Sequence, residues 1–249
     1  MARVRIDQLL VARGLAPSRA RAQAIVLAGE VTVAGVRVDK AGTLVAPDAA
    51  VEVRAADHPY VSRGGVKLAG ALDAFGIDVA GRSCLDLGAS TGGFTDCLLQ
   101  RGAARVVAVD VGYGQLAHKL RIDPRVVVME RTNARTLTPE VAGGLADLTV
   151  VDASFIGLAK LAGAIARCTR PGGELLALVK PQFEVGRAEA SRGRGVVRDE
   201  GVRGEAIEAA IEQVRAAGFE VLGQNDSVLA GPKGNREAFV HARRTGPSL

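Results

Sequence analysis

The rhythm of hydrophobic and polar residues changes near residue 62. From there, short apolar runs alternate with segments of helical spacing, beginning with a helix predicted from Arg63 to about Phe75. Nearly continuous apolar runs are typical of strands covered on both faces. The predicted strands are Ser83–Gly88, Arg105–Asp110, Arg125–Met129, Asp147–Asp152, Glu174–Lys180, Phe219–Ser227 and Ala238–Ala242. Their alternation with helices predicts an α/β domain on a doubly wound, mostly parallel sheet.

The last two apolar runs are separated only by a turn sequence, Gly231–Asn235. Parallel neighbours need a long crossover, so this short connection makes the final strand antiparallel to its neighbour. The final strand therefore starts at the edge where the parallel strands end. We expect a sheet of seven strands with the last one antiparallel.

The first part of the chain predicts a small α+β unit. Helical spacing runs from Ile6 to Gly14, and a second helix is predicted from Ser18, its candidate N-cap, to Gly29. Short alternating runs predict a hairpin and a further strand. These runs are Val31–Val33, Val36–Val38 and Val51–Val53. Pro59 and the loss of periodicity mark a linker. The predicted units are thus domain 1–56, linker 57–61 and domain 62–249.

Composition narrows the class of protein. With 48% hydrophobic and 24% charged residues, the 249-residue chain has enough apolar residues for a packed core. A net charge of +5 permits a nucleic-acid partner without requiring one. The three cysteines have no paired spacing and the three histidines are scattered, which predicts free thiols in a reducing cytoplasm and no metal site. We expect no signal peptide and no membrane span, because no run reaches the length of about 18 apolar residues that spanning requires.

A glycine-rich segment lies between the first predicted strand of the sheet and the helix after it. It reads Gly88, Ala89, Ser90, Thr91, Gly92, Gly93, Phe94, and it follows Asp86 and Leu87. Glycines let the backbone approach a ligand and turn tightly into a helix. The G-x-x-x-G-G spacing differs from that of dinucleotide sites and favours S-adenosylmethionine. The alternative is a turn with a purely structural role, which would need the same glycines.

Residues after the next two strands extend this candidate site. Asp110, followed by Val111, ends the second strand, where a carboxylate meets the ribose hydroxyls of an adenosine ligand. Asn133 follows the third strand at a position that borders the adenine in such folds. Asn133 is a candidate for hydrogen-bonding the adenine, and a turn-forming role is nearly as well supported.

Four ionisable residues form a candidate catalytic set. Asp152 and Lys180 close two predicted parallel strands, Glu237 opens the antiparallel one, and Lys67 lies on the helix before the sheet. The topology brings the three strand-end residues together at the carboxyl edge, beside the nucleotide crevice. Ordinary salt bridging at a sheet edge is the alternative for any one of them. Three at one edge, beside a methyl donor, favour catalysis.

Methyl transfer to a hydroxyl needs an aligned oxygen and a destination for its proton. Lys180 is the candidate general base. Partial burial and the nearby Lys67 favour a neutral amine, whereas Asp152 and Glu237 favour the ammonium and orient it. The sequence leaves open whether Lys180 accepts the proton or only positions the oxygen.

Two basic stretches are candidates for RNA contact. Within residues 1–21, five arginines face a single acid, Asp7, and together predict a phosphate-binding face. They are Arg3, Arg5, Arg13, Arg19 and Arg21. The second basic stretch, Arg187–Arg203, follows Lys180 and is rich in glycine (Gly193 and Gly195, with Gly186 just before it), which predicts a loop that closes on RNA. A solvated surface is the alternative for either stretch.

The residues described so far resemble the TlyA (hemolysin A) family of ribosomal RNA 2′-O-methyltransferases over nearly the whole chain. Members join an RNA-binding domain like that of ribosomal small-subunit protein four to an FtsJ-like methyltransferase domain of Rossmann-like fold. The matching segments are Arg5–Leu10, Gly14–Ala16, Ser18–Arg19, Tyr60–Leu68, Asp86–Phe94, Asp110–Leu116, Glu130–Asn133, Asp152–Ile156, Lys180–Glu184 and Gly234–Glu237. One departure is His118, where we expect an aromatic residue.

The resemblance implies an activity and a set of residues. The family's Lys-Asp-Lys-Glu tetrad falls on Lys67, Asp152, Lys180 and Glu237. It implies S-adenosylmethionine as cofactor and ribosomal RNA or ribosomal subunits as substrate, with methylation of a cytidine ribose in 16S RNA, 23S RNA or both. Family position selects Arg5, Arg19 and Lys40 for RNA contact, and Arg63, Arg131 and Arg187 are further candidates. A cytoplasmic monomer without membrane association is expected.

Three other functions compete with this interpretation. An RNA-binding ribosome-assembly factor would have lost the enzyme site, but the tetrad and glycine loop are intact. A pseudouridine synthase shares the N-terminal module, but the parallel α/β domain opposes it. A haemolytic membrane protein would need an amphipathic or apolar segment that the sequence lacks.

Overall fold

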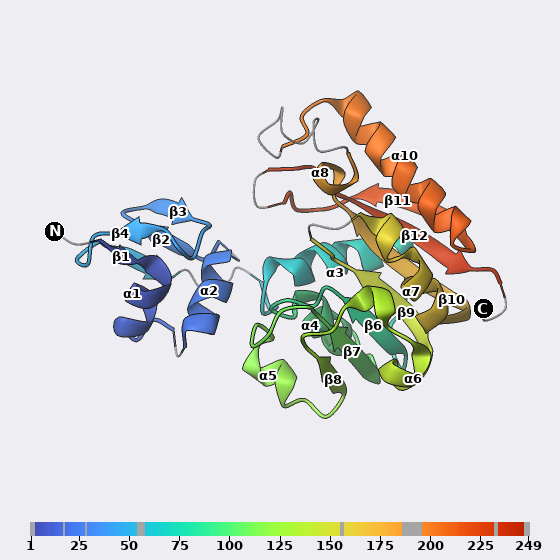
Figure 1. Ribbon diagram of the computed structural model, residues 1–249, viewed down its shortest axis with the longest axis horizontal. Coiled ribbons are helices and arrows are strands. Elements are labelled where there is room, and N and C mark those ends of the chain that lie inside the picture. Colours follow the sequence, from blue (N-terminus) through green and yellow to red (C-terminus); the bar gives the residue numbers. More distant parts are fainter. Residues whose placement is uncertain are drawn as a thin grey trace.

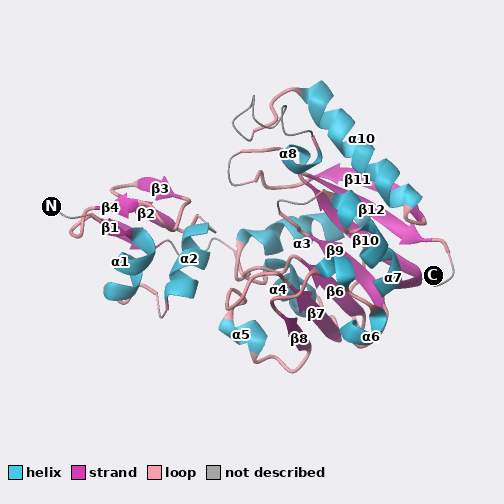
Figure 2. Ribbon diagram, in the orientation of Figure 1, coloured by secondary structure: helices cyan, strands magenta, loops and turns pink. Residues whose placement is uncertain are grey.

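A seven-stranded sheet forms the centre of the larger unit in the computed structural model (Figures 1 and 2). The structure describes residues 3–16, 18–27, 29–53, 58–154, 157–185, 196–231 and 234–246. The strands are β6 (Ser83–Leu87), β7 (Arg105–Val109), β8 (Val126–Met129), β9 (Ala146–Val151), β10 (Thr169–Val179), β11 (Phe219–Asp226) and β12 (Ala238–Arg244). They are arranged in the order β11-β12-β10-β9-β6-β7-β8, with β12 antiparallel to both neighbours. The predicted Rossmann-like sheet and its antiparallel last strand are confirmed.

One strand begins earlier than its sequence predicts. The predicted start was Glu174, whereas β10 begins at Thr169. Its register with β9 shifts between these two residues, around the segment Pro171–Gly173. Proline and glycine break the apolar run, so the pattern starts the strand only after them, yet a bulge lets pairing resume on the other side.

Helices cover both faces of the sheet (Figure 1). The prediction of a helix from Arg63 to Phe75 is confirmed by α3 (Arg63–Phe75). The other helices after the linker are α4 (Gly93–Gln100), α5 (His118–Arg121), α6 (Pro139–Ala142), α7 (Ala162–Cys168), α8 (Pro181–Glu184) and α10 (Glu200–Ala216), with 3₁₀ turns η1 (Ala134–Thr136) and η2 (Leu158–Lys160). α3 and α4 pack on one face, and α7 and α10 pack on the other.

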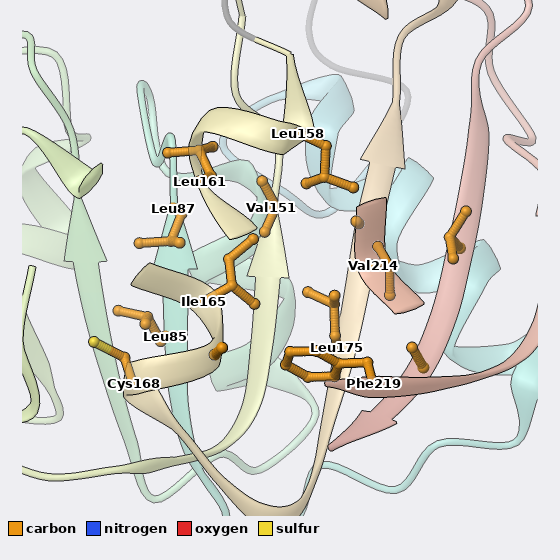
Figure 3. Packing of buried hydrophobic residues seen from close by; sticks show 14 of the residues in the cluster. Leu85, Leu87, Val151, Leu158, Leu161, Ile165, Cys168, Leu175, Val214 and Phe219 are labelled. Atoms are coloured by element: carbon orange, nitrogen blue, oxygen red, sulfur yellow. The ribbon is translucent and has the colours of Figure 1, made fainter. Parts of the chain in front are cut away.

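Alternation along each strand divides the buried side chains between two cores. In β6, Leu85 and Leu87 belong to the core with Ile165 of α7 (Figure 3). Cys84 of the same strand belongs to the opposite core, with Leu68 of α3. Successive strand residues point to opposite faces, so a run apolar at every position is buried on both sides. The sheet edge that carries the candidate residues is thereby held between two packed layers.

The small N-terminal unit has a core of its own. It contains α1 (Ile6–Ala12), α2 (Arg19–Leu27), and a three-stranded sheet of β2 (Val31–Val33), β3 (Val36–Val38) and β5 (Val51–Val53). The predicted hairpin, strand and Ser18 cap are present, with the Arg21 N–H donating to Ser18 Oγ at 3.2 Å. The pattern missed the pair β1 (Val4–Arg5) and β4 (Leu44–Val45), because two residues are too few to show a period.

The predicted linker 57–61 lies partly within the described residues. Its last residues contact α4: the Val61 N–H donates to Asp96 Oδ2 at 2.8 Å, and Gln100 Nε2 donates to the Pro59 carbonyl at 3.2 Å. Tyr60 packs against Gly65, where a side chain would collide with its ring. Residues 58–61 are therefore anchored to the helix that follows the glycine-rich loop.

The predicted basic loop needs a correction. Helix α10 begins at Glu200, so Arg203 is helical, and its guanidinium pairs with Asp226 at the end of β11. The Asp199 side chain caps the helix by accepting from the Val202 N–H at 3.0 Å. Gly186, Arg187, Gly193 and Gly195 lie outside the described residues.

Candidate active site

The carboxyl edge of the sheet gathers the four ionisable residues. Asp152 follows β9, Lys180 follows β10 and Glu237 precedes β12, which pairs directly with β10. Lys67 reaches this edge from α3, and its Nζ lies 2.5 Å from Glu237 Oε2. The sequence predicted that Asp152, Lys180 and Glu237 converge, because an antiparallel last strand begins at the edge where the parallel strands end.

Two ion pairs organise this edge. Lys180 Nζ lies 2.5 Å from Asp152 Oδ1 and donates a hydrogen bond to Ser154 Oγ at 2.8 Å. The Lys67–Glu237 pair is almost fully buried, whereas 24% of the Asp152 side chain is exposed. Desolvation offsets most of the attraction within buried ion pairs, so they are weak evidence for a stabilising role. Asp152 is therefore the more solvent-exposed carboxylate of the two pairs.

The glycine-rich loop lies directly against this group. Gly88 has a φ of +93°, and a Cβ there would lie 2.8 Å from the Asp152 carbonyl oxygen. Gly92 has a φ of +97°, and a Cβ there would lie 2.8 Å from the Leu116 side chain. Only glycine combines this backbone conformation with such close approach. The loop is therefore fixed between the catalytic candidates and the segment after β7.

A small open crevice lies beside the loop. Its lining comes from the ends of β6, β7 and β8 and the segments after them. The lining residues are Ala89, Ser90, Ala108, Asp110, Gly112, Gln115, Leu116, Val128 and Glu130. Both carboxylate oxygens of Asp110 accept backbone N–H groups, from Ser90 at 2.8 Å and from Gly112 at 2.6 Å. Asp110 thus joins the glycine-rich loop to the segment after β7.

A buried carboxylate in β6 lies just before the glycine-rich loop in the chain. Asp86 is fully buried, and its Oδ1 has no hydrogen-bond partner among the described residues. Burial raises the pKa of Asp86 to about 7; the Thr95 hydroxyl, which donates to Oδ2 at 2.6 Å, opposes the rise, and the charge of Asp152 adds to it. A nearby cation favours the carboxylate form. The carboxylates of Asp110 and Glu130 in the crevice lining, with the unpartnered Asp86 oxygen in β6, fit the cationic S-adenosylmethionine.

The other predicted cofactor residues occupy varied positions. Thr91 and Phe94 are buried, and the Phe94 ring stacks on Phe239 with centroids 6.0 Å apart. Val111 is 73% exposed. Asn133 Oδ1 accepts the Arg135 N–H at 3.1 Å and caps η1, which is the turn-forming role considered from the sequence. A contact from Asn133 to adenine stays a prediction.

Several residues around the crevice had no role in the sequence prediction. Gly112, Gln115 and Glu130 line it, although their segments were matched to the family as motifs. Ser154 was part of a motif too, but nothing in the pattern shows that it contacts Lys180. The signal that could have identified these residues is the position of their segments directly after a parallel strand, because ligands of such sheets bind there.

Two of the three predicted RNA-binding arginines of the larger unit belong to the described residues. Arg63 Nη2 donates to the Ala230 carbonyl at 3.3 Å, and burial lowers the pKa of its guanidinium. Arg131 adopts a left-handed φ of +54° and lies 4.2 Å from the centroid of the Tyr113 ring. Arg187 lies outside the described residues.

Comparisons with known proteins decide the family. The FtsJ-like methyltransferase family matches residues 60–244, and the S4 domain family matches residues 4–51. The chain is 51% identical to the 16S/23S rRNA (cytidine-2′-O)-methyltransferase TlyA of Mycobacterium tuberculosis over 242 residues, covering 97% of this chain and 90% of the relative. The chain belongs to the TlyA family of FtsJ-like methyltransferases.

Solved structures agree with this TlyA-family membership. A candidate hemolysin from Streptococcus thermophilus has a TM-score of 0.76 and 40% identity, covering 99% of this chain and 90% of its own. A candidate S-adenosylmethionine-dependent methyltransferase from Listeria monocytogenes has a TM-score of 0.55 at 15% identity, covering 73% of this chain and 98% of its own, and shares the fold alone. As in other members of this methyltransferase family, S-adenosylmethionine is the methyl donor, and the S4 domain makes RNA the substrate class.

Gly88→Ala is expected to weaken S-adenosylmethionine binding by roughly tenfold or more, because the new methyl collides with the Asp152 carbonyl. Gly81→Ala is the matched control: Gly81 has a φ of +73°, but a Cβ there meets nothing within 4 Å. Both variants carry similar backbone strain, so both should lose thermal stability. Calorimetric titration separates them, and equal affinities for the two variants would contradict the proposed contact between loop and catalytic edge.

Proposed function

We propose that this protein methylates the 2′-hydroxyl of a cytidine ribose in 16S ribosomal RNA, 23S ribosomal RNA or both. The observation that carries the proposal is the Lys180 amine, held by Asp152 and Ser154 beside the Gly88 loop. The substrate named for the Mycobacterium tuberculosis relative supports the same choice of acceptor. We further propose the domain limits 1–56, 57–61 and 62–249, and a cytoplasmic monomer that acts on ribosomal subunits.

The methyl donor supplies an electrophilic carbon, so the protein must align the acceptor and manage one proton. A neutral lysine amine has two N–H bonds and one lone pair. Ser154 Oγ accepts one N–H bond of Lys180, and Asp152 Oδ1 lies 2.5 Å from Nζ. We propose that Asp152 accepts the second N–H bond in the reacting complex, which leaves the lone pair of Lys180 to face the acceptor. A ribose hydroxyl bound there would donate its proton to Nζ as its oxygen attacks. Asp152 then stabilises the resulting ammonium.

The second ion pair is proposed to shape this edge. Glu237 is buried against Lys67, and Gly231 packs against its carboxylate. This arrangement keeps one cation and one anion fixed beside Lys180 without exposing either to solvent. We propose that the pair sets the electrostatic field at the Lys180 amine and fixes the backbone around it.

Ser154→Ala is expected to lower the single-turnover rate of methyl transfer by about tenfold, since an unsatisfied N–H lets the Lys180 amine rotate away from the acceptor. Affinity for S-adenosylmethionine should stay unchanged, because Ser154 does not line the crevice. Ser154→Thr retains the hydroxyl and should recover most of the rate. An alanine variant with the wild-type rate would remove Ser154 from the mechanism.

The alternative functions predict different biochemical results. None of the helices within the described residues is long and apolar enough to cross a membrane. Haemolysis by direct insertion would require leakage of liposomes exposed to purified protein. An assembly factor without enzyme activity would bind ribosomal subunits but fail to bind S-adenosylmethionine.

The proposed function is tested by incubating purified protein with isolated small and large ribosomal subunits and isotopically labelled S-adenosylmethionine. Nucleoside mass spectrometry after complete digestion should then find labelled 2′-O-methylcytidine. Label on a base or on another ribose would overturn the cytidine assignment. Separate digests of 16S and 23S RNA decide between one substrate and two.

A further inference from the structure

Asp7, at the start of α1, is a buried carboxylate that binds two arginines. It accepts from Arg5 Nε at 3.0 Å and Nη2 at 2.9 Å, and from Arg19 Nε at 3.0 Å. Gln23 Nε2 and the Gln8 backbone N–H complete the set, each at 3.0 Å. Five donors from three segments thus converge on one side chain with no exposed surface.

The charges in this cluster do not balance. One carboxylate faces two guanidinium groups, and the Arg5 and Arg19 side chains remain 39% and 55% exposed. Burial of a carboxylate is tolerated only when it is paired and hydrogen-bonded. Here the carboxylate is hidden while the arginines reach the surface, so the solvent-facing side of the cluster carries positive charge.

We propose that Asp7 is a positioning residue that presents Arg5 and Arg19 as a paired site for RNA phosphates. The inference rests on the proposed RNA substrate. Arg19 binds Asp7 through Nε, so its two terminal nitrogens are not used on Asp7. Arg5 Nη1 likewise makes no bond to Asp7. These N–H groups are the forked donors that suit phosphate oxygens.

A basic turn lies beside the pair. The Arg5 guanidinium lies over Gly42, where a Cβ would be 3.3 Å from Nη1. Gly42 belongs to the turn Lys40–Thr43, which closes with the Thr43 N–H donating to the Lys40 carbonyl at 3.0 Å. The third residue selected for RNA contact by family position, Lys40, therefore opens the turn that packs on Arg5.

The advantage of this arrangement is pre-organisation. A free arginine loses side-chain entropy when it binds a phosphate, whereas an arginine already held by a carboxylate has lost much of it beforehand. Hydrogen bonding from Arg5 holds the pKa of Asp7 far below its usual range, so the carboxylate stays charged in any physiological buffer. Phosphate contacts fix register rather than read sequence. The pair therefore orients the RNA relative to the module.

Asp7→Asn tests the proposal because two explanations predict opposite changes in the affinity for RNA. The change removes a negative charge, so simple electrostatics predicts tighter binding of subunits or RNA. Loss of positioning predicts the opposite: affinity weaker by roughly tenfold and a shallower dependence of affinity on salt, by about one or two phosphate contacts. Asp48→Asn is the control, because Asp48 is exposed in the same unit and undergoes the same charge change.

The measurement is a salt series of binding to isolated ribosomal subunits, with the full-length protein. Weaker binding and a lower slope for Asp7→Asn, with Asp48→Asn at or above wild type, supports the proposal. Binding by Asp7→Asn that equals or exceeds wild type overturns it. If the wild-type protein itself fails to bind or methylate subunits, the proposed function fails instead, so the two outcomes are distinct.

A second variant covers the case in which Asp7→Asn destabilises the small unit. Arg19→Lys keeps the charge at a half-exposed position but replaces the fork with a single ammonium. It should weaken binding by about fivefold or more, whereas Arg37→Lys, at an exposed arginine of the same unit outside the Asp7 cluster, should leave binding unchanged. Equal affinities for the two lysine variants overturn the proposal, and melting curves confirm that both are folded.

Discussion

Lys180→Ala should reduce methyl transfer by at least about a thousandfold, the upper part of the range for loss of a general base together with its positioning effect. Lys180 is the only member of the group at the carboxyl edge whose amine contacts both Asp152 and Ser154 among the described residues. Without it, the amine that is proposed to accept the proton and align the ribose oxygen is missing. Affinity for S-adenosylmethionine should be largely retained, because Lys180 does not line the crevice.

Two controls make this result specific. Lys160→Ala removes an exposed lysine from η2, and it should leave the rate unchanged. Lys180→Met keeps the aliphatic stem that packs at the edge while removing the amine, so it should be as inactive as the alanine variant. Single-turnover kinetics with saturating donor measures the step directly. Near-normal turnover by either Lys180 variant would refute the proposed role.

Removal of residues 1–56 should weaken ribosomal RNA binding by roughly a hundredfold while changing cofactor affinity little. The small unit has a separate hydrophobic core around Ile6, Leu10 and Val31, and neither core of the sheet includes residues from it. The cores that hold the cofactor loop should therefore survive the deletion. Residues 58–61, which contact α4, are retained in the truncated chain.

The deletion result can be checked without truncating the chain. The double variant Arg5→Ala and Arg19→Ala removes the two exposed guanidinium groups of the Asp7 cluster and should reproduce much of the loss. Subunit affinity is measured by filter binding, and cofactor affinity by calorimetry. Equal affinity for subunits with and without the small unit would exclude its role in RNA binding.

Most of the sheet could be predicted from the sequence, because most of its strands are nearly continuous apolar runs. The start of β12 at Ala238 and the turn before it placed Glu237 correctly relative to Lys180. The prediction that Glu237 lies near Lys180 depended on the direction of the last strand and not on any single motif. The bulge in β10 and the two-residue strands β1 and β4 could not be predicted from the sequence, because their formation depends on a neighbouring strand.

The finer contacts of the site depend on tertiary packing. Asp7 resembles an ordinary acid at the start of a helix, and only the fold reveals that it is buried and shared by Arg5 and Arg19. Ser154 is likewise one small polar residue after a strand until Lys180 is placed beside it. Helical and strand periods predict which face a residue occupies, but they carry no information about which distant side chain meets it.

The central claim is that this protein places a methyl group on a cytidine 2′-oxygen of ribosomal RNA. The most direct measurement maps ribose methylation at nucleotide resolution in ribosomal RNA from cells with the gene, without it, and with the Lys180→Ala variant in its place. We predict one or more cytidine 2′-O-methyl groups in 16S or 23S RNA that are present with the wild-type gene and absent in the other two strains. Identical maps in all three strains would contradict the claim.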